Sequence, residues 1–228
     1  MNFSKLTLLS ALALATLTYC GSSEEKKTSE AMDEHGMNHD HDMQTDDMMQ
    51  NKPDTELGRI QEMSREDYVS YAKMSDVAQI EASAEAKQQI SSITKSYLSL
   101  KDALVEGNTG KAADAAKNMN KQLSGFSSTS LEEELQDIYS SRADKLMQDA
   151  QAITSATDVA EQRAYLVSLS RNIAELNQAF NTEETLYLQY CPMAFDGKGG
   201  YWVSAEEKVM NPYYGDAMLT CGRVDKQL

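Results

Sequence analysis

The chain has little positive charge. It carries 21 lysine and arginine residues against 36 aspartate and glutamate residues, a formal net charge of −15 at pH 7. Nucleic acids and anionic lipid surfaces are bound through basic patches, so this balance argues against both as partners. We therefore expect no nucleic acid partner. The same charge is compatible with cations.

Histidine is scarce and confined to one short stretch. The three histidines are His35, His39 and His41, so the rest of the chain cannot form a Ser–His or Cys–His catalytic pair. The sequence also lacks HExxH, CxxC and a glycine-rich phosphate loop, which mark metalloproteases, thioredoxin-like enzymes and nucleotide-binding proteins. We predict a protein that is not an enzyme and requires no cofactor.

No apolar run is long enough to span a membrane comfortably, which takes about 20 residues. The longest run, "LTLLSALALATL", follows Lys5 and precedes "TYC", and this order is typical of a secretory signal in residues 1–20. "LTYCGSS" resembles a bacterial lipoprotein box, which implies lipidation of Cys20; ordinary cleavage nearby is the alternative. We expect export to the bacterial cell envelope, with a lipid anchor at Cys20 on the periplasmic side or the cell surface.

Residues 21–53 have almost no large apolar side chain other than methionine. Such a segment cannot bury enough surface to offset its chain entropy, so we predict a disordered acidic tether. Within it, "MDEHGMNHDHDM" gathers imidazoles, which suit copper, zinc or nickel, and thioethers, which favour Cu(I) or Ag(I). A solvated acidic spacer is the alternative. The candidate metal ligands in the tether are His35, His39, His41, Met37 and Met43.

Helical periodicity dominates residues 83–182, and one helix or two short ones are expected in residues 54–82. Two helices, separated by two others, carry apolar residues at offsets of 0, 3, 7, 10 and 14, which is one face of a helix. Ser130 and Glu133 resemble a capping box at the start of the third helix, and Thr157 or Asp158 is expected to cap the fourth. The pattern predicts an all-α fold, an antiparallel four-helix bundle. The periodic residues are Ile90, Ile93, Tyr97, Leu100 and Leu104, and then Leu166, Leu169, Ile173, Leu176 and Phe180.

Residues 183–228 depart from the helical pattern. "DGKGG" and "NPYYGD" predict turns, while "TLYLQY" alternates as a short strand would. Aromatic side chains in this stretch need a surface, so we expect a long ordered loop packed on the bundle. It carries Cys191 and Cys221, each with a methionine close by in the sequence, Met193 and Met218.

Two states of these cysteines compete, and a redox-switched mixture is a third. In the first, the thiolates of Cys191 and Cys221 and the thioethers of Met193 and Met218 form a soft site for Cu(I) or Ag(I). In the second, the cysteines form a disulfide, as cysteines of exported proteins usually do. It would close a loop of about 31 residues and stabilise the fold by about 3–4 kcal/mol. The sequence leaves these alternatives open.

A distinctive set of residues follows the helical stretch that contains "SYLSLKDALVEGN". They are Cys191-Pro192-Met193, Trp202, Asn211-Pro212-Tyr213, Gly215, Met218-Leu219 and Cys221-Gly222. With these residues the chain resembles the DUF3347 family from about residue 85 to residue 224. The resemblance implies an envelope protein, because similar domains occur fused to, or encoded beside, periplasmic subunits of heavy-metal efflux systems. It implies a copper or heavy-metal context without supplying a reaction.

These observations predict an envelope-anchored lipoprotein that captures, buffers or delivers copper-group ions, Cu(I), Cu(II) or Ag(I), in connection with efflux. The alternative is a non-catalytic interaction module, in which a loop closed by a Cys191–Cys221 disulfide docks on a heavy-metal efflux adaptor without holding metal. A helical scaffold unrelated to metals, with a merely acidic linker, is a third interpretation.

Overall fold

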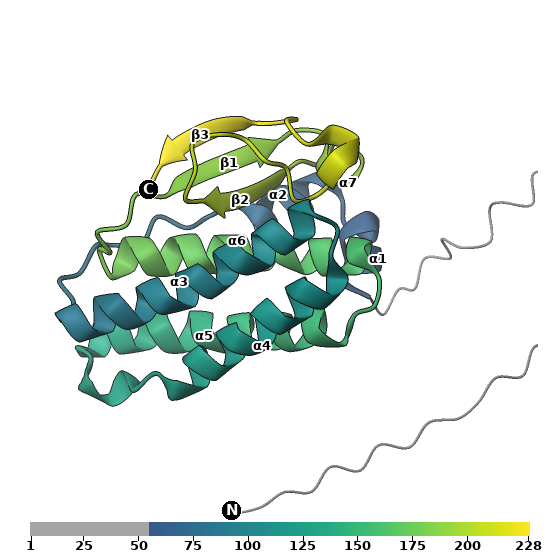
Figure 1. The fold of residues 1–228 in the computed structure, drawn as a ribbon. Coiled ribbons are helices and arrows are strands. Elements are labelled where there is room, and N and C mark those ends of the chain that lie inside the picture. The colour runs from purple at the N-terminus through teal and green to yellow at the C-terminus, as the bar shows by residue number, and fades with distance from the viewer. Residues whose placement is uncertain (1–54) are drawn as a thin grey trace, which may run out of the picture. The chain divides into compact units, whose positions relative to one another are not determined.

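A computed structural model describes residues 55–228, which form a mostly helical unit with seven helices and a small three-stranded sheet (Figure 1). Every helix within these residues is too short or too polar to cross a membrane. The predicted signal and tether, residues 1–53, lie outside the described residues. The sites predicted there, which therefore stay predictions, are Cys20, His35, Met37, His39, His41 and Met43.

Four long helices form the predicted antiparallel bundle. They are α3 (Ala84–Val105), α4 (Thr109–Gly125), α5 (Glu133–Ser155) and α6 (Val159–Ala179). Each packs on the next along the chain, and α6 closes the ring by packing on α3. The periodic apolar residues predicted on the first and fourth of these helices are all buried. The spacing therefore predicted the core-facing side of both helices correctly.

A side chain caps the start of every α-helix in residues 55–228 except α5 and the short helix at Ala194–Gly197. Asp158 caps α6, as predicted, and accepts a hydrogen bond from a backbone N–H of its first turn. The predicted capping box at Ser130 is wrong. Ser130 belongs to a short 3₁₀ turn, η1 (Ser128–Ser130), and its hydroxyl donates to the carbonyl of Ser127. The residue before α5 is Glu132, which makes no side-chain capping bond.

The C-terminal segment, expected as a loop, folds as a sheet on the bundle. The central strand β1 (Tyr187–Cys191) pairs antiparallel with β2 (Gly200–Ser204) and with β3 (Arg223–Gln227). A short helix, α7 (Ala194–Gly197), connects β1 to β2, and a 3₁₀ turn, η2 (Gly215–Met218), precedes β3. Only β1 shows the alternation that predicts a strand, because β2 is buried along most of its length and β3 is polar and mostly exposed.

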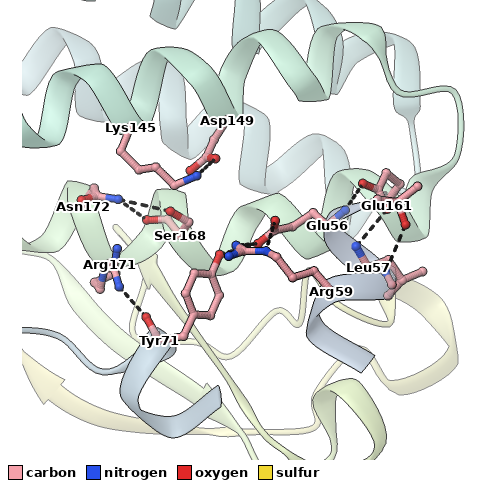
Figure 2. A network of polar contacts seen from close by, with 12 residues as sticks. Glu56, Leu57, Arg59, Tyr71, Lys145, Asp149, Glu161, Ser168, Arg171 and Asn172 are labelled. Carbon is pink, nitrogen blue, oxygen red and sulfur yellow. Dashed lines mark hydrogen bonds and ion pairs between the residues drawn. The ribbon is translucent and has the colours of Figure 1, made fainter. Parts of the chain in front are cut away.

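Residues 55–82 form what we call the N-terminal strap, which contains α1 (Glu56–Glu62) and α2 (Arg65–Ala72). Both short helices pack on α6. At the start of α1, the carboxylate of Glu161 accepts the first two helical N–H groups, at 2.7 and 3.0 Å (Figure 2). These N–H groups have no partner inside the helix, so an acidic side chain is favourable there. Glu161 therefore fixes where the strap begins on the bundle.

The rest of the strap is held in the same way, through its backbone. Arg171 donates to the carbonyl of Tyr71, the penultimate residue of α2 (Figure 2). Glu175 accepts the N–H of Ser75 at 2.7 Å, while its other oxygen accepts from Arg142 at 2.9 Å. The bonds of Arg171 and of Glu175 to Ser75 run from bundle side chains to strap backbone, so the position of the strap is fixed by polar contacts as well as by its buried apolar residues.

Buried charges complete this contact. Glu56 on α1 is buried and accepts hydrogen bonds from Arg59 and from the hydroxyl of Tyr71 (Figure 2). Asp149 on α5 is buried as well and binds Lys145 at 2.7 Å. Burial raises the pKa of the Asp149 carboxyl above its usual value, against the opposing effect of Lys145. Buried charges therefore accompany the apolar contacts that the strap makes with the core through Ile60, Tyr68 and Ala72.

Candidate functional site

The structure brings together the two cysteines of the C-terminal segment. Cys191 Sγ and Cys221 Sγ lie 3.1 Å apart, although the residues are 30 positions apart in the chain. The sulfurs are unbonded, since a disulfide bond is about 2.05 Å long. Cys191 is fully buried and Cys221 is partly exposed. We call these two residues the thiol pair.

The sheet and one glycine position the thiol pair. Cys191 is the last residue of β1, and the preceding residue, Tyr190, pairs with Arg223 of β3. Gly222 links Cys221 to β3 with a φ of +146°, which L side chains rarely adopt. A Cβ at Gly222 would lie 2.9 Å from the Tyr190 carbonyl oxygen. A residue without a side chain at 222 therefore lets the backbone bring Cys221 against β1.

A buried asparagine holds the segment before Cys221. Asn211 is fully buried, and its Nδ2 donates to the carbonyl of Cys221 at 2.8 Å. Its Oδ1 accepts the N–H of Tyr213, also at 2.8 Å, and its own N–H donates to Leu219 at 2.7 Å. Sequence reasoning treated Asn211 only as part of a turn and of a family motif. A buried amide bound to backbone on both sides is a positioning group.

The two methionines are held near the thiol pair by their backbones. The N–H of Cys221 donates to the carbonyl of Met218 at 3.0 Å, and the hydroxyl of Tyr214 donates to the carbonyl of Met193. Their side chains are 41% and 50% exposed, respectively. Exposed thioethers on a surface are free to turn toward an ion, but whether they ligate one stays a prediction.

The local electrostatics favour the protonated form of the Cys221 thiol. The hydrogen bond to Cys191, followed by burial and by the proximity of a second thiolate, raises the pKa of the Cys221 thiol above its ordinary value. Within residues 55–228, no three histidine, cysteine, aspartate or glutamate side chains gather as a metal-binding group. An ion at the thiol pair would therefore depend on two sulfurs and on thioether, backbone or solvent ligands, a set that suits soft ions of low coordination number.

Trp202 is an aromatic neighbour of this site whose contact with it sequence reasoning missed. It is fully buried on β2, and its ring lies 3.0 Å from the position a Cβ would take at Gly222. Its centroid is 5.9 Å from that of Tyr213, nearly perpendicular to it. Because it is the single tryptophan of the chain, its fluorescence reports on the surroundings of Cys221.

We predict that Gly222→Ala separates the thiol pair. The added Cβ meets backbone at 2.9 Å and the residue keeps a positive φ, so the chain around Cys221 must shift. The expected result is faster alkylation of Cys191 by iodoacetamide under reducing conditions, about tenfold or more, because local opening exposes buried thiols, together with altered Trp202 fluorescence. The matched control is Gly125→Ala, where a Cβ meets nothing within 4 Å. Equal alkylation rates in Gly222→Ala and the parent would contradict the assignment.

The comparisons with known proteins add one finding. The family model described as "Protein of unknown function (DUF3347)" matches residues 93–185, a shorter span than the predicted 85–224. The match runs from α3 through α6 and ends before β1, so the thiol pair lies outside it. No curated protein and no solved structure matches the chain. Residues 93–185, the greater part of the helical bundle, therefore form a DUF3347 domain.

Proposed function

We propose that the protein binds copper-group ions as cargo, with the thiol pair as the site in the folded part of the chain. The observation that carries this proposal is the 3.1 Å approach of Cys191 Sγ and Cys221 Sγ at the end of the central strand β1. When two cysteine sulfurs from distant parts of a chain lie this close, they form a soft-metal site or a pair that can become a disulfide, and few other arrangements bring them together. Soft thiolate and thioether ligands select Cu(I) and Ag(I) over the harder divalent ions.

The surroundings of the thiol pair suit uptake and release better than permanent storage. Cys221 is partly exposed, and the side chains of Met193 and Met218 are each about half exposed, so an ion reaches the site from solvent. Exchangeable cargo needs such access, whereas structural metal sites are closed by four protein ligands. The net charge of −15 also raises the local concentration of cations around the protein.

The cellular setting of the proposal comes from the sequence. The signal-like residues 1–20 and Cys20 suggest a lipid-anchored envelope protein, and the resemblance to DUF3347 proteins suggests a link to heavy-metal efflux. In this scheme the tether captures ions through His35, His39 and His41, and the thiol pair holds or passes them on. No reaction is assigned to the protein.

Cu(I) titration tests the proposal directly. The chain without residues 1–20, titrated under reducing conditions against bicinchoninate, is expected to retain Cu(I) and to quench Trp202 fluorescence. Replacing Cys191 and Cys221 together by serine should remove the fluorescence change. It should also lower the Cu(I) affinity of this site by more than about 100-fold, because removing the ligands themselves weakens binding more than removing the groups that hydrogen-bond to ligands, which typically costs about 10- to 100-fold.

A tether variant serves as the matched control. Replacing His35, His39 and His41 by alanine is expected to lower the stoichiometry while leaving the Trp202 response intact. The two serine replacements are then made in the tether variant. If this protein binds as much Cu(I) as the tether variant with both cysteines intact, the thiol pair is not the site.

The raised pKa of Cys221 predicts a pH dependence with a definite sign. At neutral pH the Cys221 thiol is protonated, so an incoming ion must displace its proton. Apparent Cu(I) affinity should therefore rise by at least about tenfold per pH unit between pH 6 and 8. The measurement uses the tether variant, so that histidine titration does not contribute. An affinity independent of pH in this range would show that the Cys221 thiolate is not a ligand.

The second candidate function is a disulfide-closed module that docks on an efflux adaptor without holding metal. The same 3.1 Å separation favours it, since a small closure would join the sulfurs. Alkylation of the purified protein without reductant, followed by mass measurement, distinguishes the two. We expect two labels on Cys191 and Cys221 when Cu(I) is absent, and protection of both when it is bound. An unlabelled pair in protein prepared from the envelope would favour the docking module instead.

A further inference from the structure

A cavity of about 450 Å³ lies between α2 and the sheet, apart from the thiol pair. Its walls are apolar and aromatic: α2 supplies Val69 and Ala72, β1 supplies Leu188 and Tyr190, and β2 supplies Tyr201. Val69 is about half exposed at this cavity. Cavities of this size and lining are typical of sites for small molecules.

The aromatic wall of the cavity is preformed. The ring centroids of Tyr190 and Tyr201 are 4.5 Å apart, and the guanidinium of Arg223 lies 4.7 Å from the Tyr190 centroid. Gly199 packs against Tyr190 so closely that a Cβ would lie 2.2 Å from the Tyr190 hydroxyl. The hydroxyl of Tyr68, on α2, donates to the Gly199 carbonyl and joins the two sides. A ligand would therefore enter an existing space, at little cost in ordering.

The charges around the cavity are positive on balance, in contrast to the whole chain. Its lining includes Lys73, Lys198 and Lys226. The ammonium group of Lys198 is occupied by three carbonyl groups at the end of α1. Neither Lys73 nor Lys226 forms an ion pair within residues 55–228.

Two acidic residues also line the cavity, and neither forms an ion pair with these lysines within residues 55–228. Asp225 is paired with Arg223 at 3.4 Å, and Asp76 is exposed. Two unpaired ammonium groups beside an apolar cavity, in a chain with a net charge of −15, favour an occupant with an apolar body and one negative charge.

We propose that this cavity binds a small amphipathic carboxylate, such as a medium-chain fatty acid. The acyl chain lies between Val69, Leu188 and Tyr190, and the carboxylate reaches Lys73 and Lys226. The site does not depend on metal binding, so its test and that of the thiol pair are independent.

The test is calorimetric titration of the chain without residues 1–20 with dodecanoate below its micellar concentration. Dodecyltrimethylammonium, with the same chain length and the opposite charge, is the matched probe. We expect one saturable site for dodecanoate and at least tenfold weaker binding of the cation. Val69→Glu, at an exposed position on α2, should weaken dodecanoate binding at least tenfold by placing a carboxylate at the entrance.

A pair of charge variants separates a local effect from a general one. Lys73→Glu with Lys226→Glu should weaken dodecanoate binding at least tenfold, whereas Lys117→Glu with Lys121→Glu on α4, which makes the same change in net charge, should change it less than twofold. Circular dichroism verifies that each variant is folded. Absence of saturable binding, equal affinity for the two probes, or equal effects of the two double variants would overturn the proposal.

Discussion

The positions of the other elements depend on helix α6, which is covered by helices and by the sheet. It packs on α3 and α5 within the bundle and also on α1, α2 and β2, so it has no broad solvent face. A helix in this position is usually apolar all round, yet α6 buries six polar residues. Most of them bond to groups outside α6, although the Asn172 amide nitrogen donates to Ser168 within the helix. An unpaired buried polar group costs about 1–3 kcal/mol. Glu175, together with Glu161 and Arg171 of the same helix, binds the strap, so polar side chains of α6 determine where the strap lies. The six are Gln162, Ser168, Ser170, Asn172, Glu175 and Asn177.

This arrangement explains which parts of the fold sequence patterns predict. The apolar spacing on α3 and α6 identifies the faces that meet in the bundle core. The polar residues of α6 look like a solvent face, because periodicity does not distinguish water from a second layer of protein. One hydroxyl illustrates the difference: Tyr97 belongs to the predicted core stripe, but it also accepts the N–H of Val203 and contacts Ser170 Oγ. It thereby joins α3, α6 and β2, a sheet contact that the sequence does not show.

Sequence patterns likewise predict one part of the candidate site and miss another. Counting cysteines predicted that Cys191 and Cys221 would act together, and the structure brings them to 3.1 Å. The groups that achieve this are less visible in the sequence. Asn211 holds the Cys221 carbonyl, and Gly222 permits the close approach to β1. Such positioning residues have no periodicity, and their role depends on pairings between segments far apart in the chain, which a single sequence does not specify.

The connection between β1 and β2 relates the thiol pair to the strap. It starts directly after Cys191 and ends at Lys198 and Gly199, which bind the end of α1 and the Tyr68 hydroxyl. Within it, Phe195 and Asp196 have φ values of 51° and 57°, a conformation that side-chain-bearing residues keep only where surrounding contacts hold them. Cys191 therefore lies between a paired strand and an anchored connection, and a group supported on both sides keeps its geometry without a ligand. Because the site is already ordered in the folded chain, the ion proposed to bind there would need only to displace protons and solvent, and such a site would favour fast exchange over slow assembly around the ion.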